Sequence, residues 1–274
     1  MKKRNILFAL PFSLFMLGAC GGDGTDPLNN DPIADDQKQP KKMCMMKTMS
    51  FELGTSKRVM FFEYKKGKLS TVKTDIEGKE SQTMVYNFNK SGNLQSFLSG
   101  STIANYVYNG KDQLISIDEE RGLSTRTFEY NDEGQISRQV TVFGGKPYTT
   151  HIYEYDADGQ PIKVTILDKS YEETEVNEIT YDDKSNPFKN KGGMVNSMEL
   201  VLGYPVGNQD HNVITIKKTY KKKTAYQVNG KYMNPGDVVV NQISYEYNEN
   251  GYPTSMHRKR GNKERELVIA YTCE

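Results

Sequence analysis

One phrase of aromatic, polar and glycine positions recurs along the chain. It reads aromatic, any residue, aromatic, Asn or Asp, two polar residues, Gly, any residue, then an aliphatic residue or Pro. The clear copies begin at Tyr86, Phe128, Tyr153 and Tyr245, and degenerate copies begin at Phe62, Tyr106 and Ile179. A repeat of this kind predicts one structural unit used many times.

Each copy of the phrase predicts a β-hairpin. Two aromatics two positions apart lie on one face of a strand. The Asn or Asp hydrogen-bonds the backbone ahead of it, and the Gly adopts the left-handed conformation that closes the turn. We therefore expect an all-β, antiparallel meander of about a dozen strands. That number exceeds the roughly ten at which an open sheet curls, splits or closes, so the expected outcome is a strongly curved sheet or a partly closed barrel.

The repeat is interrupted between 184 and 244. Apolar residues there fall at helical spacing and predict one short amphipathic helix near 192–203: Met194, Val195, Met198, Val201 and Leu202. Its apolar stripe must cover another surface, and the open mouth or the concave face of the curled sheet is available for this. Strands are expected to resume at 211–223 and 236–247.

The N-terminus contains a predicted targeting signal. Residues 1–19 combine a basic start with a short apolar run and predict a signal peptide. The run ends in Leu17-Gly18-Ala19-Cys20, which resembles a bacterial lipobox, so Cys20 is the expected lipid-attachment site and the membrane a partner through that anchor. The alternative is an ordinary signal peptide with an incidental Cys.

The segment after Cys20 is predicted to connect the lipid anchor to the folded domain. Residues 20–42 are rich in Gly, Pro, Asp and Asn and predict a disordered tether. Residues 43–274 form the single predicted β-meander domain. The acidic tether resembles those of surface-exported Bacteroides lipoproteins, which implies an outer-membrane, lipid-anchored protein on the periplasmic or the surface-exposed face, with the surface favoured.

Composition narrows the functional classes. The formal net charge is +1 and apolar residues make up 36% of the chain. This balance excludes a nucleic-acid binder that works through a strong positive field. The 18 Tyr and the absence of Trp suit a half-buried sheet, with rings inward and hydroxyls at a wet edge.

Two families resemble this chain. The hairpin phrase is similar to the YD repeat of Rhs-type proteins, which have far more copies. Over about 45–274, the tandem hairpins and the stretch Asn186-Pro187-Phe188-Lys189-Asn190 look like Bacteroides lipoprotein domains of unknown function that have a porphyrin ligand. This resemblance implies a cavity for a flat apolar macrocycle, with porphyrin or haem as its ligand. No other cofactor is indicated.

The candidate ligand-binding residues follow from that cavity. The helix would supply Met194 and Met198, and further donors would come from Tyr204, His211 and His257. Strand alternation lets only one of Met256 and His257 face the cavity, and the sequence leaves both open.

The sequence contains few features that indicate catalysis or metal binding. It has three His and no common hydrolase, phosphate-loop or zinc motif. Asp182-Asp183 and Glu119-Glu120 fall in predicted turns, where acids are usually solvated. The Met-rich stretch at 43–49 could offer sulfur ligands but is interpreted as core filling. We expect no enzyme and no metal site.

Two further features have alternative interpretations. The basic runs 217–223 and 257–260 could bind an anion, but a solvated sheet face or a charged edge is the favoured interpretation. Cys44 and Cys273 are the thiols left after acylation of Cys20, so a disulfide is favoured over two unpaired cysteines.

The functional hypothesis is a non-catalytic outer-membrane or surface lipoprotein. It would bind a hydrophobic or macrocyclic small molecule, or present a surface to an outer-membrane protein partner. The alternative is an adhesin-like or structural module that binds a protein or glycan and no small molecule.

Overall fold

The computed structural model describes residues 44–53, 55–120, 124–186, 210–225, 227–228, 230–261 and 263–273. The chain divides into two units, Met1–Pro40 and Lys41–Glu274, and every described residue belongs to the second. The predicted signal peptide, the tether, Cys20 and the helix near 192–203 lie outside the described residues.

Sixteen antiparallel strands form a closed barrel, and two short strands, β14 and β15, form a separate hairpin. The bounds are β1 (Cys44–Leu53), β2 (Ser56–Lys65), β3 (Lys68–Ile76), β4 (Gln82–Phe88), β5 (Leu94–Ser99), β6 (Thr102–Tyr108), β7 (Leu114–Glu120), β8 (Ser124–Tyr130), β9 (Ile136–Phe143), β10 (Lys146–Tyr155), β11 (Pro161–Asp168), β12 (Glu173–Ser185), β13 (His211–Tyr220), β14 (Gln227–Val228), β15 (Lys231–Tyr232), β16 (Val238–Tyr247), β17 (Pro253–Arg260) and β18 (Lys263–Cys273).

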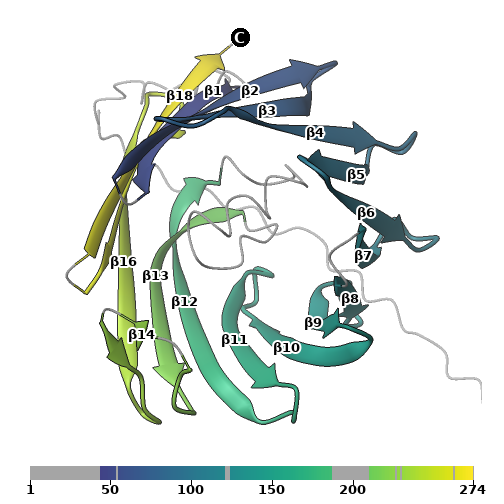
Figure 1. Cartoon of the computed structure of the whole chain (residues 1–274), viewed down its shortest axis with the longest axis vertical. Helices are drawn as coiled ribbons and strands as arrows, with labels where there is room; N and C mark the ends of the chain where they lie inside the picture. Colours follow the sequence, from purple (N-terminus) through teal and green to yellow (C-terminus); the bar gives the residue numbers. More distant parts are fainter. Residues whose placement is uncertain are drawn as a thin grey trace, which may run out of the picture. The chain divides into compact units, whose positions relative to one another are not determined.

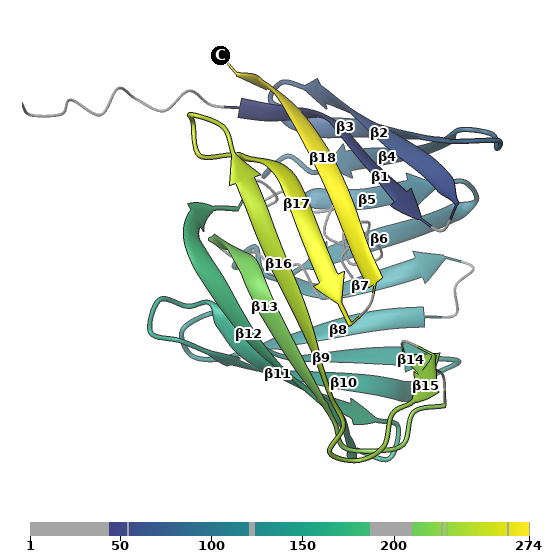
Figure 2. The ribbon, with the colours of Figure 1, turned by 90° about the vertical axis from the view of Figure 1, so that its left-hand side faces the viewer.

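The strands follow one another around the barrel almost entirely in chain order (Figures 1 and 2). The exception is β16, which pairs with β13 because the β14–β15 hairpin is inserted between them. β1 closes the ring by pairing with β2 on one side and with β18 on the other. We call the junction of β1 and β18 the seam.

The predicted all-β, antiparallel class is correct, but the expected dozen strands and partial closure were wrong. Six complete phrase hairpins account for twelve strands. β1, β12, β13 and β18 lie outside these hairpins and raise the number to sixteen. The first and last strands contain no phrase, so the pattern could not reveal that they pair.

A β-bulge in each phrase hairpin explains how the sheet closes. In the β10–β11 hairpin, Asp156 Oδ1 accepts hydrogen bonds from the backbone N–H groups of Asp158 (3.1 Å) and Gln160 (2.8 Å), and Gly159 has φ +81°. The register then shifts between Glu154 and Tyr155. Corresponding shifts precede the second aromatic of the other five phrase hairpins, at Tyr64, Phe88, Tyr108, Tyr130 and Tyr247. Bulges bend and twist a strand pair, so six of them curl the sheet toward closure.

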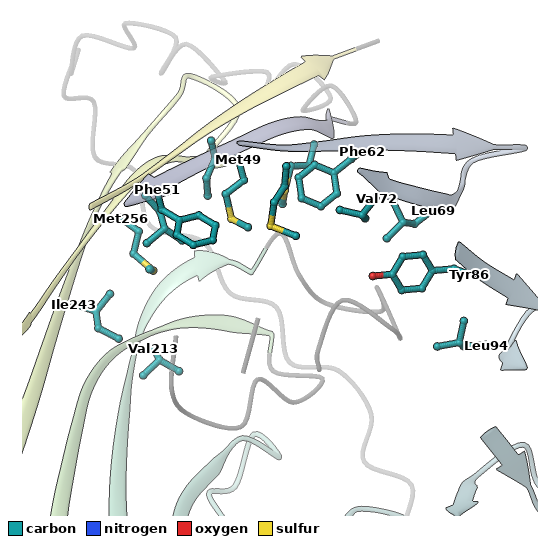
Figure 3. Close-up of a cluster of buried hydrophobic side chains, with 14 of the residues drawn as sticks. Met49, Phe51, Phe62, Leu69, Val72, Tyr86, Leu94, Val213, Ile243 and Met256 are labelled. Atoms are coloured by element: carbon teal, nitrogen blue, oxygen red, sulfur yellow. The ribbon is translucent and has the colours of Figure 1, made fainter. Parts of the chain in front are cut away.

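An apolar core covers part of the barrel's inner face (Figure 3). Met49 and Val72 are completely buried, and Met256 and Leu267 are 1% exposed. Side chains alternate along each strand, so the same register that turns Met256 inward turns His257 outward. Of the two residues that the sequence left open, Met256 therefore faces the interior.

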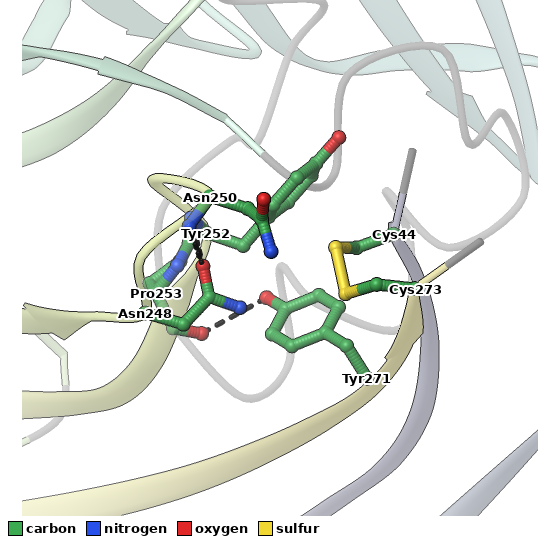
Figure 4. The surroundings of a disulfide bond; sticks show 7 residues. All are labelled: Cys44, Asn248, Asn250, Tyr252, Pro253, Tyr271 and Cys273. Carbon is green, nitrogen blue, oxygen red and sulfur yellow. Dashed lines mark hydrogen bonds between the residues drawn. A yellow bond between two sulfur atoms is a disulfide. The ribbon is translucent and has the colours of Figure 1, made fainter. Parts of the chain in front are cut away.

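A disulfide joins the two strands of the seam. Cys44 and Cys273 are directly opposite in the β1–β18 register, with a Cα–Cα distance of 4.0 Å (Figure 4). The bond links residues 229 positions apart in the chain. It therefore ties the first barrel strand to the last.

Candidate functional site

Tyrosines line the inner face at the end of the barrel that carries the phrase turns. Each of five hydroxyls donates a hydrogen bond to a backbone carbonyl oxygen on the preceding strand, at 2.6–2.9 Å: Tyr108 to Leu94, Tyr130 to Leu114, Tyr155 to Ile136, Tyr181 to Pro161, and Tyr271 to Pro253. Burial raises the pKa of Tyr108 and Tyr155 to about 12. Four of the five, all except Tyr271, are the second aromatic of a phrase, and each hydroxyl links its strand to the preceding one.

The inner face changes character toward the opposite end of the barrel, where charged residues replace the aromatics. On β7–β13, which we call the paired wall, the charges form ion pairs within the chain. Lys218 Nζ lies 2.8 Å from Glu175 Oε1, and both side chains are nearly buried, at 13% and 11% exposure. Arg126 Nη2 lies 3.5 Å from Glu119 Oε1. Buried charges are tolerated when they are paired in this way.

His151 lies on the inner face among these pairs. It is opposite Gln139 on β9 and Ile166 on β11. Burial lowers the pKa of His151 to about 4; Glu175 opposes this shift, while Lys218 and Arg126 add to it. The imidazole is therefore neutral at pH 7.

The inner face of β1, β2 and β16–β18, which we call the seam wall, has a different arrangement of charge. Arg258 on β17 lies directly opposite Arg265 on β18, and Arg260 lies directly opposite Lys263. Arg258 is 9% exposed and donates from Nη2 to Asn241 Oδ1 at 3.0 Å. Two like-charged cross-strand pairs therefore follow each other along the same two strands.

An open pocket of about 1070 Å³ lies at these cations, and we call it the seam pocket. The β1–β18 register runs from Cys44–Cys273 to Phe51–Leu267, and the pocket lies where β18 continues past that pairing. Its inner-face lining is Phe51, Arg258, Arg260, Lys263 and Arg265. Gln227 and Val228 of β14 line another side, and Glu52, Lys57, Glu264 and Glu266 lie around it as well.

The β14–β15 hairpin is positioned by a small apolar cluster of its own. Val228 packs with Met233, Tyr220 and Val239, and all four are buried. Tyr220 and Val239 belong to the barrel strands β13 and β16. This contact holds β14 against the barrel at the seam pocket.

A second pocket of about 590 Å³ lies on the outer face of β16–β18. Its outward side chains include Gln242, Ser244, His257 and Lys259. An acidic side chain lies beside each of the last two. His257 Nε2 lies 3.8 Å from Glu266 Oε1, and Lys259 Nζ lies 3.2 Å from Glu264 Oε1. Its polar side chains are therefore largely engaged with one another.

The predicted ligand donors do not come together in the described part of the molecule. His211 begins β13, where its backbone N–H donates to Gln160 Oε1 at 3.3 Å and its Nδ1 lies 3.1 Å from the Lys184 carbonyl oxygen. His257 is exposed on the outer face of β17. Met194, Met198 and Tyr204 lie outside the described residues. The candidate disulfide residues Cys44 and Cys273 are joined, as described above.

Neither acidic pair occupies a turn, so the expected location was wrong, although Asp183 is solvated, with 83% of its side chain exposed. Asp182 lies in β12, accepts the backbone N–H of Asn212 at 3.0 Å and receives the Tyr247 hydroxyl. Glu119 lies in β7 and also accepts from Ser124 Oγ at 2.8 Å. Both acids are part of the barrel wall.

Each basic run is divided between the two faces, so its interpretation as a solvated face was only half correct. Lys217 pairs with Glu178 on the outer face at 2.6 Å, whereas Lys218 pairs with Glu175 inside. In the second run, His257 and Lys259 face outward while Arg258 and Arg260 face inward. Alternation separates the arginines from His257 and Lys259 but does not say which set faces inward. The pairing of Arg258 with the buried Ile243 and of Arg260 with the buried Asn241 places the arginines inside.

Two features are absent from the described residues. No group of three or more His, Cys, Asp or Glu in that part of the chain is arranged to hold a metal ion. The described residues also contain no helix that is long and apolar enough to cross a membrane.

Comparisons with known proteins identify a fold and no family. No family model matches the chain, and neither does any curated protein. The barrel is similar to the crystal structure of a porin-like protein from Bacteroides uniformis, with a TM-score of 0.57 and 14% identity over 83% of this chain and 96% of that one. The TcdB2–TccC3–Cdc42 structure is similar at a TM-score of 0.31, with 11% identity over 79% of this chain and 14% of that one. At these identities the first likeness establishes the barrel fold, and the second carries no argument.

Proposed function

We propose that this protein is a non-catalytic, lipid-anchored protein of the bacterial outer membrane or cell surface that binds a small molecule in its barrel. The ligand class is an apolar or macrocyclic molecule that carries anionic groups, with porphyrin as the model compound. The observation that carries the proposal is the seam pocket, which is bordered by apolar side chains that include Phe51 and Val228, by five cationic side chains, four of them on the inner face, and by three acidic ones. Concave sites that combine apolar walls with a few convergent polar groups are typical of ligand binding.

The proposed location rests on the lipobox at Cys20 and on the outer face of the barrel. Three cross-strand ion pairs lie on the outer face of β8–β13: Glu129–Arg138 at 2.7 Å, Glu154–Lys163 at 2.7 Å and Glu178–Lys217 at 2.6 Å. A charged side chain facing lipid costs about 2–4 kcal/mol at the bilayer midplane. These pairs favour a barrel wall that faces water and is held to the membrane by its lipid. The similar Bacteroides barrel, which is described as porin-like, supports this location only through its fold.

Binding is tested by titrating the full chain with protoporphyrin and following tyrosine quenching and the Soret band. We expect a Kd of micromolar or better, which is about −8 kcal/mol. Gln227→Trp places a bulky side chain at the pocket wall and should weaken binding at least tenfold. Tyr232→Trp, on the neighbouring strand β15 and outside the pocket lining, is the matched control. No spectral change at tens of micromolar would exclude a porphyrin-like ligand.

One observation favours a second candidate, a surface module that binds a protein or glycan. Phe143 and Tyr148 on the β9–β10 hairpin are 55% and 61% exposed, and their ring centroids lie 6.4 Å apart. Exposed aromatic pairs are common contact residues in such modules. If protoporphyrin does not bind, replacing both rings with Ser should abolish binding of the full chain to immobilised glycans or proteins.

A further inference from the structure

The seam pocket contains an arrangement of charge that the barrel alone does not favour. Like charges directly across an antiparallel pair destabilise the sheet. Arg258–Arg265 and Arg260–Lys263 are two such pairs, at successive inward positions of β17 and β18. The chain concentrates four cations within two register steps.

The acids around the same pocket are directed elsewhere. Glu264 and Glu266 are opposite Lys259 and His257 in the register, and their carboxylates lie beside those outer-face partners. They alternate with Lys263 and Arg265 along β18 and so occupy the opposite face of the sheet. On the paired wall, by contrast, Glu175 and Glu119 lie on the inner face beside their cations.

Unused hydrogen-bond donors point to the same place. The Nε atoms of Arg58 and Arg260 are buried and have no hydrogen-bond acceptor among the described residues. Arg58 is opposite Phe51 on β1, and both Phe51 and Arg260 line the seam pocket. A buried donor of this kind is costly unless it gains a partner.

We infer that the seam pocket recognises a ligand with two anionic groups, one between Arg258 and Arg265 and the other between Arg260 and Lys263. Guanidinium groups bind carboxylate and phosphate oxygens in a bidentate fashion. Successive inward positions of a strand are about 7 Å apart, so this is the approximate spacing expected of the two anionic groups. The inference rests on the proposed function and names the chemical class that the site selects.

The test compares charge on the ligand with charge in the pocket. Protoporphyrin, which has two carboxylates, and its uncharged dimethyl ester are each titrated into the full chain. The pocket variant Arg260→Gln/Arg265→Gln removes one cation from each pair. The control variant Lys163→Gln/Lys217→Gln removes the same charge from the outer face, away from the seam pocket. We expect esterification and the pocket variant each to weaken binding at least tenfold, and the control variant to bind like wild type.

A second readout does not depend on the porphyrin ring. Mellitate, a benzene ring with six carboxylates, should raise the Tm of the wild-type and control proteins and leave that of the pocket variant unchanged. Without any ligand at low salt, the pocket variant should have the higher Tm, because the like-charge repulsion is relieved. If the double variant does not fold, Lys263→Gln and the ester comparison provide the same test.

The outcomes separate the two proposals. Equal binding of acid and ester by wild type and pocket variant would overturn the dianion inference and leave small-molecule binding in place. Failure of both porphyrins, with mellitate still stabilising wild type but not the pocket variant, would exclude the macrocycle and support the anion site. No effect of mellitate on wild type would overturn the inference.

Discussion

The paired wall and the seam wall both contain the same hairpin phrase, but their inward charges are arranged differently. One wall has acid–base pairs, and the other has like-charged cross-strand pairs. Inside the paired wall, Glu175 accompanies Lys218 and Glu119 accompanies Arg126. Inside the seam wall, Arg258 is opposite Arg265 and Arg260 is opposite Lys263. The acid–base pairs of the paired wall are structural ion pairs, whereas the like-charged pairs of the seam wall are the place where we propose that an anion binds.

The difference is confined to one end of the barrel. At the other end, both walls use the same hydrogen bond from a tyrosine hydroxyl to a carbonyl oxygen. Tyr155 makes it to Ile136 on the paired wall, and Tyr271 makes it to Pro253 on the seam wall. The comparison can therefore be tested separately at each end.

The largest effect is expected at the seam itself. Replacing Cys44 and Cys273 with Ala removes a cross-link that spans 229 positions. In the chain-entropy model this destabilises the domain by about 5 kcal/mol. Urea unfolding of the oxidised wild type and the variant measures the difference. A loss below about 1 kcal/mol would show that strand pairing alone secures the closure.

The next largest effect is expected on the paired wall. Glu175→Gln leaves Lys218 buried without its counter-charge and should cost about 4 kcal/mol of unfolding free energy. Glu178→Gln breaks the exposed Lys217 pair three positions along the same strand and should cost less than about 1 kcal/mol. Equal losses in the two variants would contradict the assignment of Glu175 as the structural charge.

His151 provides the pH dependence of the paired wall. Its pKa falls from 6.5 to about 4 on folding, chiefly through burial. Below pH 6.5 the unfolded chain therefore binds a proton that the folded chain does not accept until about pH 4. Stability is present above pH 6.5 and decreases as the pH falls toward 4, by about 3 kcal/mol in total.

This pH effect is measured by urea unfolding at pH 7, 5.5 and 4. His151→Gln should remove this part of the slope. His257→Gln, on the exposed outer face of β17, should retain it. A slope that survives in His151→Gln would assign the acid sensitivity to other groups.

The smallest effect is expected where the two walls are alike. Tyr155→Phe and Tyr271→Phe each remove one hydroxyl-to-carbonyl hydrogen bond and should each cost about 1 kcal/mol. Thermal or urea unfolding of the two variants gives the comparison. Costs that differ by more than about 1 kcal/mol would show that the walls also differ at the tyrosine end.

The sequence by itself determined the repeating unit. Tyr153, Tyr155, Asp156 and Gly159 specify a strand, a turn and a return through interactions within a few residues, and the structure has that hairpin. Local chemistry of this kind can be read directly from the chain, because the groups that satisfy each other are neighbours in sequence. The all-β, antiparallel class followed from it.

Closure and the candidate site were decided only in the tertiary structure. β1 and β18 meet from opposite ends of the chain, and no phrase marks either strand. The inward direction of Arg258 and the outward direction of His257 depend on the register of β17 against both neighbours. A shift of one residue would exchange the two faces, so a single strand read alone cannot assign them. The cations of the seam pocket come from the consecutive strands β17 and β18, whereas its other walls come from β1 and β14, which are remote from them in sequence.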